Sequence, residues 1–385
     1  MKILFVTGNL ELGKDGVGDY TIMMAKTCME AGCHCAIIAL NDVYLNVDSV
    51  TDNFDKIPFL RLRSSLNWSG KKALAKAFAN NFDPEFVSIQ MVCYAFQPRG
   101  WIFGLGKKIK SLFSNSVRFE VNLHEVWLGF SINHNLKARL NGILQKRTLL
   151  LFLNELNPIK IHVGNNVYFS LLNAIGYQVQ YLPLPSNIPI KEKPNLEWIK
   201  DEFHLVDKSN CLVFIFFGSI QGNWDVKAFW NKILSLTEKK RVCAISVGKQ
   251  GFGHVLWDEM VSEFKHQIDF KKLGFKTNSE ISDLLHFSDF GIATTPMSLL
   301  GKSGSAMAMI EHGLPVIVTR DELKYNYEIK KVENTYPAVV LWEAVQGLDH
   351  FPKTGLLRSR TTEIANLFLN NLKQNEAIWK PLVLN

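Results

Sequence analysis

Lys302, Ser303, Gly304 and Ser305 form the stretch of this chain whose residue types are best suited to chemistry. They follow an apolar strand predicted over 290–294 and precede a helix of small residues and methionines that ends at Gly313. The first turn of a helix has unpaired backbone N–H groups and lies at the positive end of the helix dipole. That position suits a phosphate group, and Lys302 adds a full positive charge beside it. An ordinary capped helix is the alternative, because Ser and Gly are common caps.

A second loop rich in glycine follows the apolar run that we predict as the first strand, residues 3–7. Glycine permits positive φ and a close approach of the backbone to a ligand. The spacing does not match the GxGxxG fingerprint of dinucleotide-binding proteins. We expect a phosphate or sugar contact from three residues of this loop, Gly16, Val17 and Gly18. Asp19 would either cap the following helix or face an acceptor.

Size and composition indicate a folded protein of two domains. The 385 residues are many for a single core, and 47% are hydrophobic against 21% charged. A net charge of +7 favours anionic partners, nucleotide phosphates or anionic lipid, while no nucleic-acid motif accompanies it. The cysteines form no CxxC pairs, so we expect no metal site. The first apolar run is too short for a signal peptide, and we expect a cytoplasmic location.

Predicted strands and helices alternate along the whole chain, which is typical of doubly wound α/β folds. The expected strands cover 3–7, 35–40, 86–92, 117–123, 159–164, 212–217, 242–247, 268–273, 290–294 and 316–319. Four prolines between Pro183 and Pro194 indicate an interdomain link. We therefore predict a first domain over 1–185, a linker over 186–205, a second domain over 206–360 and terminal helices over 361–385.

Four short motifs occur in an order that resembles one group of enzymes. They are GVGDYT (16–21), LHEVW (123–127), FFGS (216–219), and KSG with EHGLPV (302–316). The chain resembles retaining glycosyltransferases of the GT-B fold class, close to glycosyltransferase family 4. This resemblance implies two doubly wound Rossmann-like domains facing across a cleft. The N-terminal domain would bind the acceptor, the C-terminal domain the nucleotide sugar, and the terminal helices would pack back toward the N-terminal domain.

For the first domain, the resemblance implies that His124 is a catalytic residue near the donor sugar, with Glu125 beside it on the acceptor side. A histidine held by structural hydrogen bonds is the alternative. Tyr94 and Phe96 follow another predicted strand and are expected to line the acceptor site, because aromatic side chains stack on sugars. Ordinary packing of these two aromatic residues explains them equally well.

For the second domain, the resemblance implies donor contacts after two strands, from Gly218 and Ser219 and from Gly248 and Lys249. Ser219 stands where the family has an arginine. Asn223 and Trp224 lie where its lysine is expected, so this chain departs from the family in its source of positive charge.

The family's pair of glutamates is also missing, because the two positions hold Leu300 and Ala308. Glu311 could reach toward the ribose instead, and a solvated glutamate at a helix end is the alternative. Lys302 with the turn that follows resembles a basic-Gly-Ser variant, in which backbone amides and the basic side chain would hold the donor phosphates.

The reaction implied is transfer of a sugar from a nucleotide-sugar co-substrate to a glycan, lipid-linked or small-molecule acceptor, with retained configuration. Lys302 and the helix N-terminus would stabilise the charge on the leaving diphosphate, so that no metal or other cofactor is expected to be obligatory. Two alternatives stay open. One is a catalytically silent nucleotide-sugar-binding protein, and the other is a non-hydrolysing nucleotide-sugar epimerase of the same fold.

The segment 101–113 joins apolar residues to three lysines, Lys107, Lys108 and Lys110. An apolar face beside lysines would rest on an anionic membrane surface and bring the enzyme to a lipid-linked acceptor. The alternative is a helix that covers the sheet and exposes its lysines to solvent.

Overall fold

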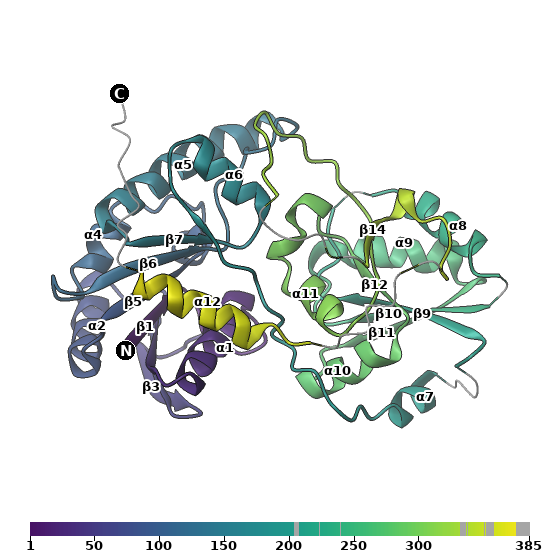
Figure 1. Ribbon diagram of the computed structural model, residues 1–385, viewed down its shortest axis with the longest axis horizontal. Helices are drawn as coiled ribbons and strands as arrows, with labels where there is room; N and C mark the ends of the chain where they lie inside the picture. Colours follow the sequence, from purple (N-terminus) through teal and green to yellow (C-terminus); the bar gives the residue numbers. More distant parts are fainter. Residues whose placement is uncertain are drawn as a thin grey trace. The chain divides into compact units, whose positions relative to one another are not determined.

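The computed structural model describes residues 1–203, 208–222, 224–238, 240–331, 336, 338–349, 351 and 358–374. Asn223 and the predicted terminal segment beyond residue 374 lie outside this set. The chain forms two units (Figure 1). Unit 1 comprises 1–183, 323–332 and 361–385, and unit 2 comprises 184–322 and 333–360.

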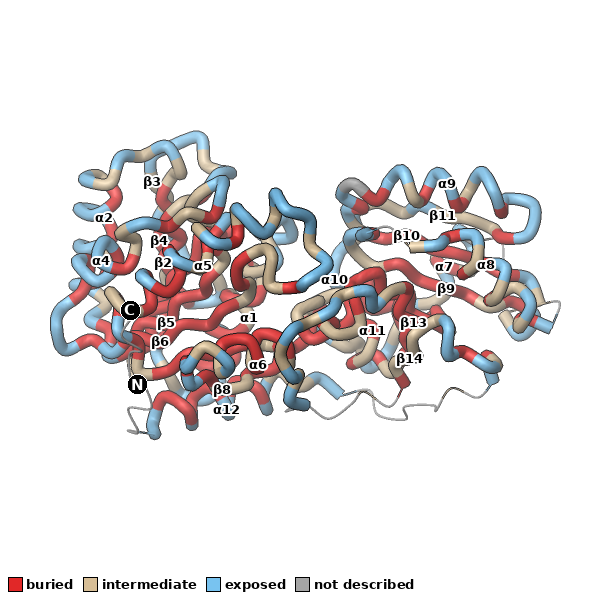
Figure 2. The backbone as a smooth tube through the Cα atoms, turned by 90° about the horizontal axis from the view of Figure 1, so that it is seen from above, coloured by how far each residue is buried: buried red, intermediate tan, exposed pale blue. Residues whose placement is uncertain are grey.

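Unit 1 is built on an eight-stranded sheet in the order β3-β4-β2-β1-β5-β6-β7-β8. Its strands are β1 (Lys2–Thr7), β2 (His34–Asp42), β3 (Ser49–Phe54), β4 (Ile57–Arg63), β5 (Phe86–Met91), β6 (Arg118–Leu123), β7 (Lys160–Val163) and β8 (Gln180–Tyr181). Only the β3–β4 pair is antiparallel. The central strands β1 and β5 are buried along most of their length, as expected of apolar runs inside a parallel sheet (Figure 2).

The helices of unit 1 are α1 (Gly16–Glu30), α2 (Trp68–Phe82), α3 (Cys93–Phe96), α4 (Leu105–Lys110), α5 (Leu136–Leu156), α6 (Asn166–Ala174) and α12 (Thr361–Lys373). Four of them begin at an Asp or Asn whose side chain accepts a backbone N–H of the first turn, a favourable cap: Asp15, Asn67, Asn135 and Asn165. The C-terminal helix α12 packs beside α1, and Phe368 stacks on Phe5 of β1 with ring centroids 6.0 Å apart.

Unit 2 contains a six-stranded parallel sheet in the order β11-β10-β9-β12-β13-β14. Its strands are β9 (Cys211–Phe217), β10 (Arg241–Val247), β11 (Ile268–Gly274), β12 (Phe290–Ala293), β13 (Val316–Val318) and β14 (Val339–Leu341). The order places the first strand of the unit in the middle, with later strands added on both sides. This is the doubly wound arrangement expected from the sequence.

Helices cover both faces of this second sheet. They are α7 (Glu197–Phe203), α8 (Val226–Ser235), α9 (His254–Phe264), α10 (Asn278–Phe287) and α11 (Gly304–Glu311), with short 3-10 helices η1 (Gly251–Gly253), η2 (Met297–Lys302) and η3 (Trp342–Ala344). Side chains of a strand alternate between faces. Val213 and Ile215 therefore share a core with α10 and α11, whereas Phe214 and Phe216 pack with Trp230 and other aromatic residues under α8 and α9.

Each strand predicted from the sequence is present to within one or two residues. Strands β3 and β4 were not predicted. Their turn uses Asp55 and Lys56 at positive φ, 45° and 73°, instead of the Asn-Gly or Asp-Gly pair that marks a hairpin in a sequence. The short strands β8 and β14 also carry too few residues for a periodic pattern.

The proline-rich segment that we predicted as a linker is folded onto unit 2 as far as it is described. The backbone N–H of Asn195 donates to Asp283 at 2.8 Å, and the Lys191 ammonium lies 2.7 Å from the same carboxylate. Ile188 and Ile199 are buried in the core of the unit. The division between the units falls at Pro183–Leu184.

Residues 323–332 leave unit 2 and join unit 1. Lys324 exchanges hydrogen bonds with Ser131, and its carbonyl accepts the backbone N–H of Ile132 at 2.9 Å. Tyr325 stacks on Phe130 with ring centroids 6.3 Å apart. No local sequence pattern predicts this excursion, because its contacts join loops almost two hundred residues apart.

Gly142 lets α5 approach the loop that follows β6. A Cβ on this residue would lie 1.8 Å from the carbonyl oxygen of Leu128. Beside it, the buried Gln145 accepts the Leu128 N–H at 2.9 Å and donates to the Tyr94 hydroxyl at 2.7 Å. The helix therefore fixes two loops at the carboxyl edge of the sheet.

We expect Gly142→Ala to lower the free energy of unfolding by about 1–3 kcal/mol, because the new methyl group overpacks this contact. In a helix without such a contact, Gly→Ala would stabilise by roughly 0.5–1 kcal/mol. Urea unfolding followed by circular dichroism measures the change, and Asn80→Ala on the exposed side of α2 is the control. A stabilised Gly142→Ala variant would contradict the proposed contact.

Candidate functional site

The carboxyl ends of the central strands of unit 2 form the first candidate site. In the order β11-β10-β9-β12-β13-β14, the connections from β9 lead to one side and the later strands lie on the other. The order in which strands are added reverses between β9 and β12, and open α/β sheets bind ligands at such a switch point. The loops after β9 and β10 and the segment leading to α11 meet there.

Three glycine-containing turns touch at this point. Gly218 follows β9 at φ 80°, and a Cβ on it would lie 3.6 Å from the Cβ of Ser305 at the start of α11. Gly248 follows β10 at φ 89°, and its Cβ would lie 3.4 Å from the Cα of Gly218. Both distances are ordinary van der Waals contacts, so the positive φ of the two turns is the feature that favours glycine here. The structure therefore brings together Gly218, Gly248 and Ser305, all candidates from the sequence.

The first turn of α11 contains backbone N–H groups that can donate hydrogen bonds to a ligand. Ser303 caps the helix, and its hydroxyl accepts the N–H of Ala306 at 3.3 Å. Among the described residues, the N–H groups of Gly304 and Ser305 have no hydrogen-bond partner, as usual for a first helical turn. The hydroxyls of Ser303 and Ser305 lie 3.2 Å apart. Lys302 ends η2 directly before the cap and is half-buried.

Exposed polar groups surround this turn. Ser219 is exposed, and its hydroxyl donates to the Lys249 carbonyl at 3.4 Å, so these two candidates lie together. Lys249 is also exposed. Thr294, after β12, accepts the Gln221 N–H at 2.8 Å and donates to the Ser219 carbonyl at 3.3 Å. These bonds hold the β9 loop against the β12 loop.

Arg320 is a basic group near this edge that sequence reasoning missed. It follows β13, and its guanidinium covers Gly222 so closely that a Cβ there would lie 1.2 Å from Nη1. Its Nε donates to Glu322 at 2.9 Å, so part of its charge is neutralised. The search for a cation after β9 overlooked Arg320 because it comes from a different strand. Its place directly after an apolar strand was the available signal.

Glu311 has well-defined partners within unit 2. Its side chain is buried; one oxygen accepts the Ser186 N–H at 2.9 Å and the other accepts the Arg360 N–H at 3.3 Å. The alternative of a solvated glutamate is wrong, because the residue is only 5% exposed. Glu311 ties together the segments through which the chain enters and leaves this unit. A ribose contact from it stays a prediction.

The two positions of the missing glutamate pair belong to the core. Leu300 and Ala308 are 3% and 0% exposed and pack with Met307 and Val318. No carboxylate stands at either place.

His124 follows β6 at the carboxyl edge of the sheet of unit 1 and is half-buried. Its Nε2 lies 2.8 Å from Oε1 of Gln90, and its ring meets the Tyr20 ring edge-on with centroids 4.9 Å apart. Loss of hydration lowers the pKa of His124 to about 4. The imidazole is therefore neutral at pH 7 and suited to accept a hydrogen bond or a proton.

In the segment that follows β1, two backbone N–H groups are already hydrogen-bonded within the segment. Asp15 caps α1, and its carboxylate accepts the N–H groups of Val17 and Gly18 at 3.0 and 2.8 Å. Asp15, instead of Asp19, is the cap. The amides of two candidate phosphate contacts are thus engaged by a carboxylate, whereas Gly16 has open space around it. Sequence reasoning overlooked Asp15.

Asp19 is half-buried and accepts the Gly13 N–H at 3.0 Å, and burial raises the pKa of its carboxyl while that hydrogen bond opposes the shift. Tyr94 and Phe96 lie on α3 directly after β5. Tyr94 is 39% exposed, Phe96 is half-buried and Glu125 is half-buried beside His124. A Cβ on Gly8 would lie 2.5 Å from Ala95, so the loop after β1 and helix α3 are in close contact. The acceptor-side candidates therefore share one edge of this sheet.

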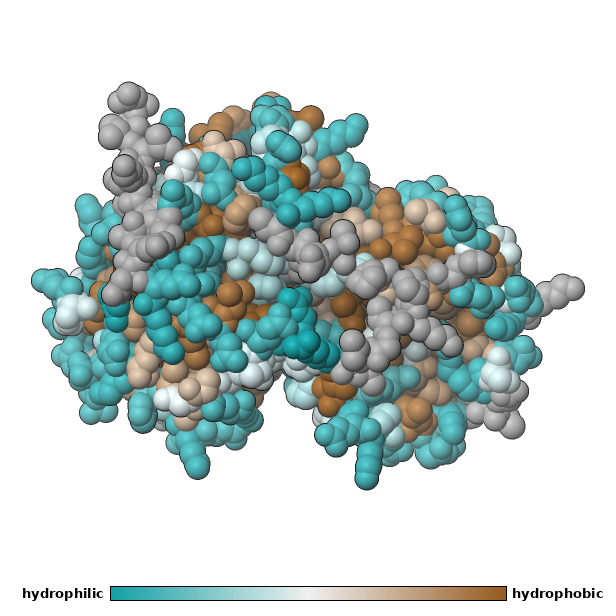
Figure 3. Space-filling model, viewed as in Figure 1, coloured by the Kyte–Doolittle hydropathy of each residue, from teal (hydrophilic) through white to brown (hydrophobic). Residues whose placement is uncertain are grey.

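The lysine-rich segment packs differently from an amphipathic membrane helix. Ile109 in α4 is fully buried, and the neighbouring apolar residues Ile102, Leu112 and Phe113 are buried as well. Lys107, Lys108 and Lys110 are exposed, together with Phe103. On the face shown in Figure 3, hydrophobic residues form separate patches among hydrophilic ones. The membrane contact expected from the sequence thus depends on the lysines and Phe103 alone.

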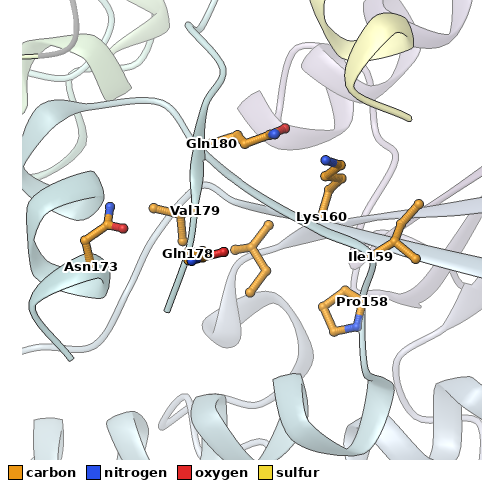
Figure 4. A pocket seen from close by; sticks show the side chains of 8 residues that line it. Pro158, Ile159, Lys160, Asn173, Gln178, Val179 and Gln180 are labelled. Carbon is orange, nitrogen blue, oxygen red and sulfur yellow. The ribbon is translucent and has the colours of Figure 1, made fainter. Parts of the chain in front are cut away.

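A cavity of about 200 Å³ lies where β7 and β8 begin, lined by Pro158, Lys160, Asn173 and Gln180 among others (Figure 4). Lys160 Nζ and Gln180 Oε1 have no hydrogen-bond partner within the described part of the chain. This is the amino edge of the sheet, opposite the edge that carries His124. We therefore separate the cavity from the candidate site.

Within the described ranges, no group of three or more His, Cys, Asp or Glu side chains could hold a metal ion. The same residues include no helix of the length and apolar character needed to cross a membrane.

Comparisons with known proteins identify the fold. No family model matches the sequence, and no curated protein matches it. Sucrose-phosphate synthase from Thermosynechococcus elongatus is similar in structure, with a TM-score of 0.59 at 10% identity over 97% of this chain and 90% of that chain. HepE from Anabaena, in complex with UDP and glucose, has a TM-score of 0.55 at 13% identity, covering 98% and 92%.

A glycosyltransferase from Rickettsia africae has a TM-score of 0.56 at 16% identity, covering 98% of this chain and 95% of that chain. The prediction of two parallel-sheet α/β domains of the GT-B class is confirmed by these structures. The chain therefore has the fold of GT-B glycosyltransferases.

Glu311→Ala should destabilise unit 2, because it leaves two backbone N–H groups without their acceptor at about 1–3 kcal/mol each. Differential scanning calorimetry should show a lower Tm, with a smaller loss for Glu311→Gln, which keeps one acceptor oxygen. Glu259→Ala on the exposed side of α9 is the control. If Glu311→Ala has the same Tm as the unmodified protein, the structural role is contradicted.

Proposed function

We propose that this protein is a glycosyltransferase that moves a sugar from a nucleotide-sugar donor to a glycan, lipid-linked or small-molecule acceptor. The observation that carries the proposal is the meeting of Gly218, Gly248 and the first turn of α11 at the switch point of unit 2. Unpaired helix N–H groups, two serine hydroxyls and a lysine at one place suit a diphosphate. HepE, which shares the fold, is described in complex with UDP-glucose, and this supports a donor of that class.

The leaving diphosphate would bind to the N–H groups of Gly304 and Ser305 and to the ammonium of Lys302. Negative charge develops on its bridging oxygen as the sugar leaves, and fixed donors stabilise that charge without reorganising. Retention of configuration and independence of a metal are parts of the proposal. Ser219, Gly248 and Lys249 would contact the same ligand from the other two turns.

His124 would act at the transferred sugar or the acceptor. Its neutral ring at pH 7 supports this role, because only a neutral imidazole has a nitrogen that accepts a hydrogen bond. Tyr94, Phe96, Asp19 and Glu125, which share the edge of the same sheet, would contribute to acceptor binding. Gly16, Val17 and Gly18 remain proposed donor contacts, although Asp15 competes for two of their amides.

A catalytically silent nucleotide-sugar-binding protein is the second candidate. It is favoured by Leu300 and Ala308, buried apolar residues where related enzymes carry glutamates. Binding without release of UDP from any donor sugar would favour this second candidate over the first.

Lys302→Ala should weaken UDP binding by about tenfold or more, because a hydrogen bond to a charged group contributes roughly 1.5–3 kcal/mol. Isothermal titration calorimetry measures the affinity. Lys265→Ala is the control, because Lys265 is exposed at the C-terminus of α9, at the opposite edge of the sheet. Equal affinities of Lys302→Ala and the unmodified protein would remove Lys302 from the site.

His124→Ala should lower the release of UDP from UDP-glucose by about 100-fold or more, as expected for loss of a group that moves a proton or binds the reacting sugar. UDP affinity in calorimetry should stay unchanged. His266→Ala, which alters an exposed histidine of unit 2, should release UDP at the rate of the unmodified protein. Full activity of His124→Ala would rule out a catalytic role.

A further inference from the structure

A row of polar side chains crosses the buried sheet of unit 1. Ser88 and Gln90 of β5 pair in register with Glu120 and Asn122 of β6, and Asn122 pairs with His162 of β7. All five are 5% exposed or less. Strands covered on both faces are normally apolar, and a buried carboxylate is rare unless it is paired. The row therefore needs an explanation.

These side chains form a continuous chain of hydrogen bonds that begins at His124. Its Nε2 lies 2.8 Å from Gln90 Oε1, and the Gln90 amide donates to the Ser88 hydroxyl at 2.7 Å. The Ser88 hydroxyl donates to Glu120 at 2.5 Å. The second oxygen of Glu120 lies 2.7 Å from Nδ1 of His162, whose Nε2 lies 3.0 Å from the Asn371 amide of α12.

The carboxylate of Glu120 sets the direction of this chain. A carboxylate only accepts hydrogen bonds, so the Ser88 hydroxyl must donate its single hydrogen to Glu120. The Ser88 oxygen can then only accept, and the Gln90 amide nitrogen must donate to it. Gln90 is thereby oriented with its carbonyl oxygen toward His124. The amide of Asn122 also donates to this oxygen, at 3.2 Å.

We propose that Glu120, acting through Ser88 and Gln90, holds His124 in the tautomer that carries its proton on Nε2, and so reserves Nδ1 as an acceptor for a ligand hydroxyl. Gln90, Ser88 and Glu120 are then positioning residues. The consequence for the ligand rests on the function proposed above, whereas the tautomer itself does not.

The surroundings of His124 agree with this assignment. Within the described residues, Nδ1 has no hydrogen-bond partner, and the residue stays partly exposed. The titratable groups beside it are Tyr20, whose pKa is raised by burial first and by the charge of Glu120 next, and the adjacent Glu125. Because burial lowers the pKa of His124 itself, the ring is neutral at pH 7, and only the choice between two neutral tautomers is left open.

The tautomer also decides what His124 recognises. With Nε2–H pointed at Gln90, the ring cannot donate to a ligand and can only accept at Nδ1. A sugar hydroxyl satisfies that acceptor, because it can donate its hydrogen. A ligand group that only accepts, such as a phosphate or carbonyl oxygen, would meet the lone pair of Nδ1 unfavourably. The hydrogen bonds from Glu120 through Ser88 and Gln90 to His124, here called the relay, thus favour a ligand hydroxyl at Nδ1 of His124.

The test is a long-range ¹H–¹⁵N NMR spectrum of protein labelled with ¹⁵N-histidine, recorded at pH 7, in which the two neutral tautomers give different patterns. His124 signals are assigned by their loss in His124→Gln. The Nε2–H form should exceed the other by about tenfold, because the alternative leaves Gln90 Oε1 and Nε2 as two facing acceptors. A majority of the Nδ1–H form in the unmodified protein would overturn the proposal.

Two substitutions test the relay itself. Glu120→Gln supplies an amide that can donate to Ser88, so the whole chain can reverse, and the Nδ1–H form of His124 should rise roughly fivefold or more. Ser88→Ala removes the hydroxyl that links Glu120 to Gln90 and is a smaller change. It replaces Glu120→Gln as the test variant if Glu120→Gln does not fold. An unchanged tautomer ratio in a folded variant would also overturn the proposal.

His312 is the internal control for these spectra. Its Nδ1 lies 2.8 Å from the Ala308 carbonyl, which can only accept, so this histidine must carry its proton on Nδ1. It belongs to unit 2, and neither substitution should alter its signals. No substrate is needed for any of these measurements. A failure of the proposed transferase activity would therefore leave the tautomer result intact, and a wrong tautomer would leave the activity assays intact.

Discussion

The buried carboxylate of Glu120 is the interaction on which much of unit 1 depends. A carboxylate removed from water must find hydrogen-bond donors, because its unpaired burial costs far more than the stability of a typical domain can tolerate. Ser88 and His162 supply those donors from the two neighbouring strands. Each donor residue in turn needs a hydrogen-bond partner for its remaining polar atoms. One buried carboxylate therefore constrains which polar side chains occur from β5 to α12. The last described helix is thereby part of the polar core of the first domain.

In unit 2 the corresponding constraint is backbone conformation. The turns at Gly218 and Gly248 adopt positive φ, which glycine permits, and they lie close to each other and to the first turn of α11. Among the described residues, the first N–H groups of α11 stay available at the carboxyl edge of the sheet, and helix N-termini favour anions. Lys302 and Arg320 bring positive charge to the same edge from later in the chain.

Two acidic residues near the motifs, Glu311 and Asp15, have structural hydrogen-bond partners in the fold. Glu311 receives backbone N–H groups from Ser186 and Arg360, and Asp15 receives those of Val17 and Gly18. In each case a carboxylate satisfies donors that the fold would otherwise leave unpaired at a helix end or a crossing of the chain. Acidic residues near a motif therefore need their hydrogen-bond partners examined before they are assigned to a substrate.

By itself, the sequence determined the alternation of strands and helices, the two-domain organisation, the GT-B class and the turns that carry the main motifs. The alternation, the two-domain organisation and the turns depend on local periodicity and on glycine and proline, which act within a few residues. The GT-B class was predicted instead from the resemblance of four ordered motifs to known glycosyltransferases. Only the tertiary structure decided that Lys324 returns to unit 1, that Glu311 is buried and that Arg320 covers Gly222. The alternating polar residues of β5 and β6 are visible in the sequence, but their meaning comes from strand register. Pairing places Ser88 beside Glu120 across 32 residues of chain, and no local pattern contains that information.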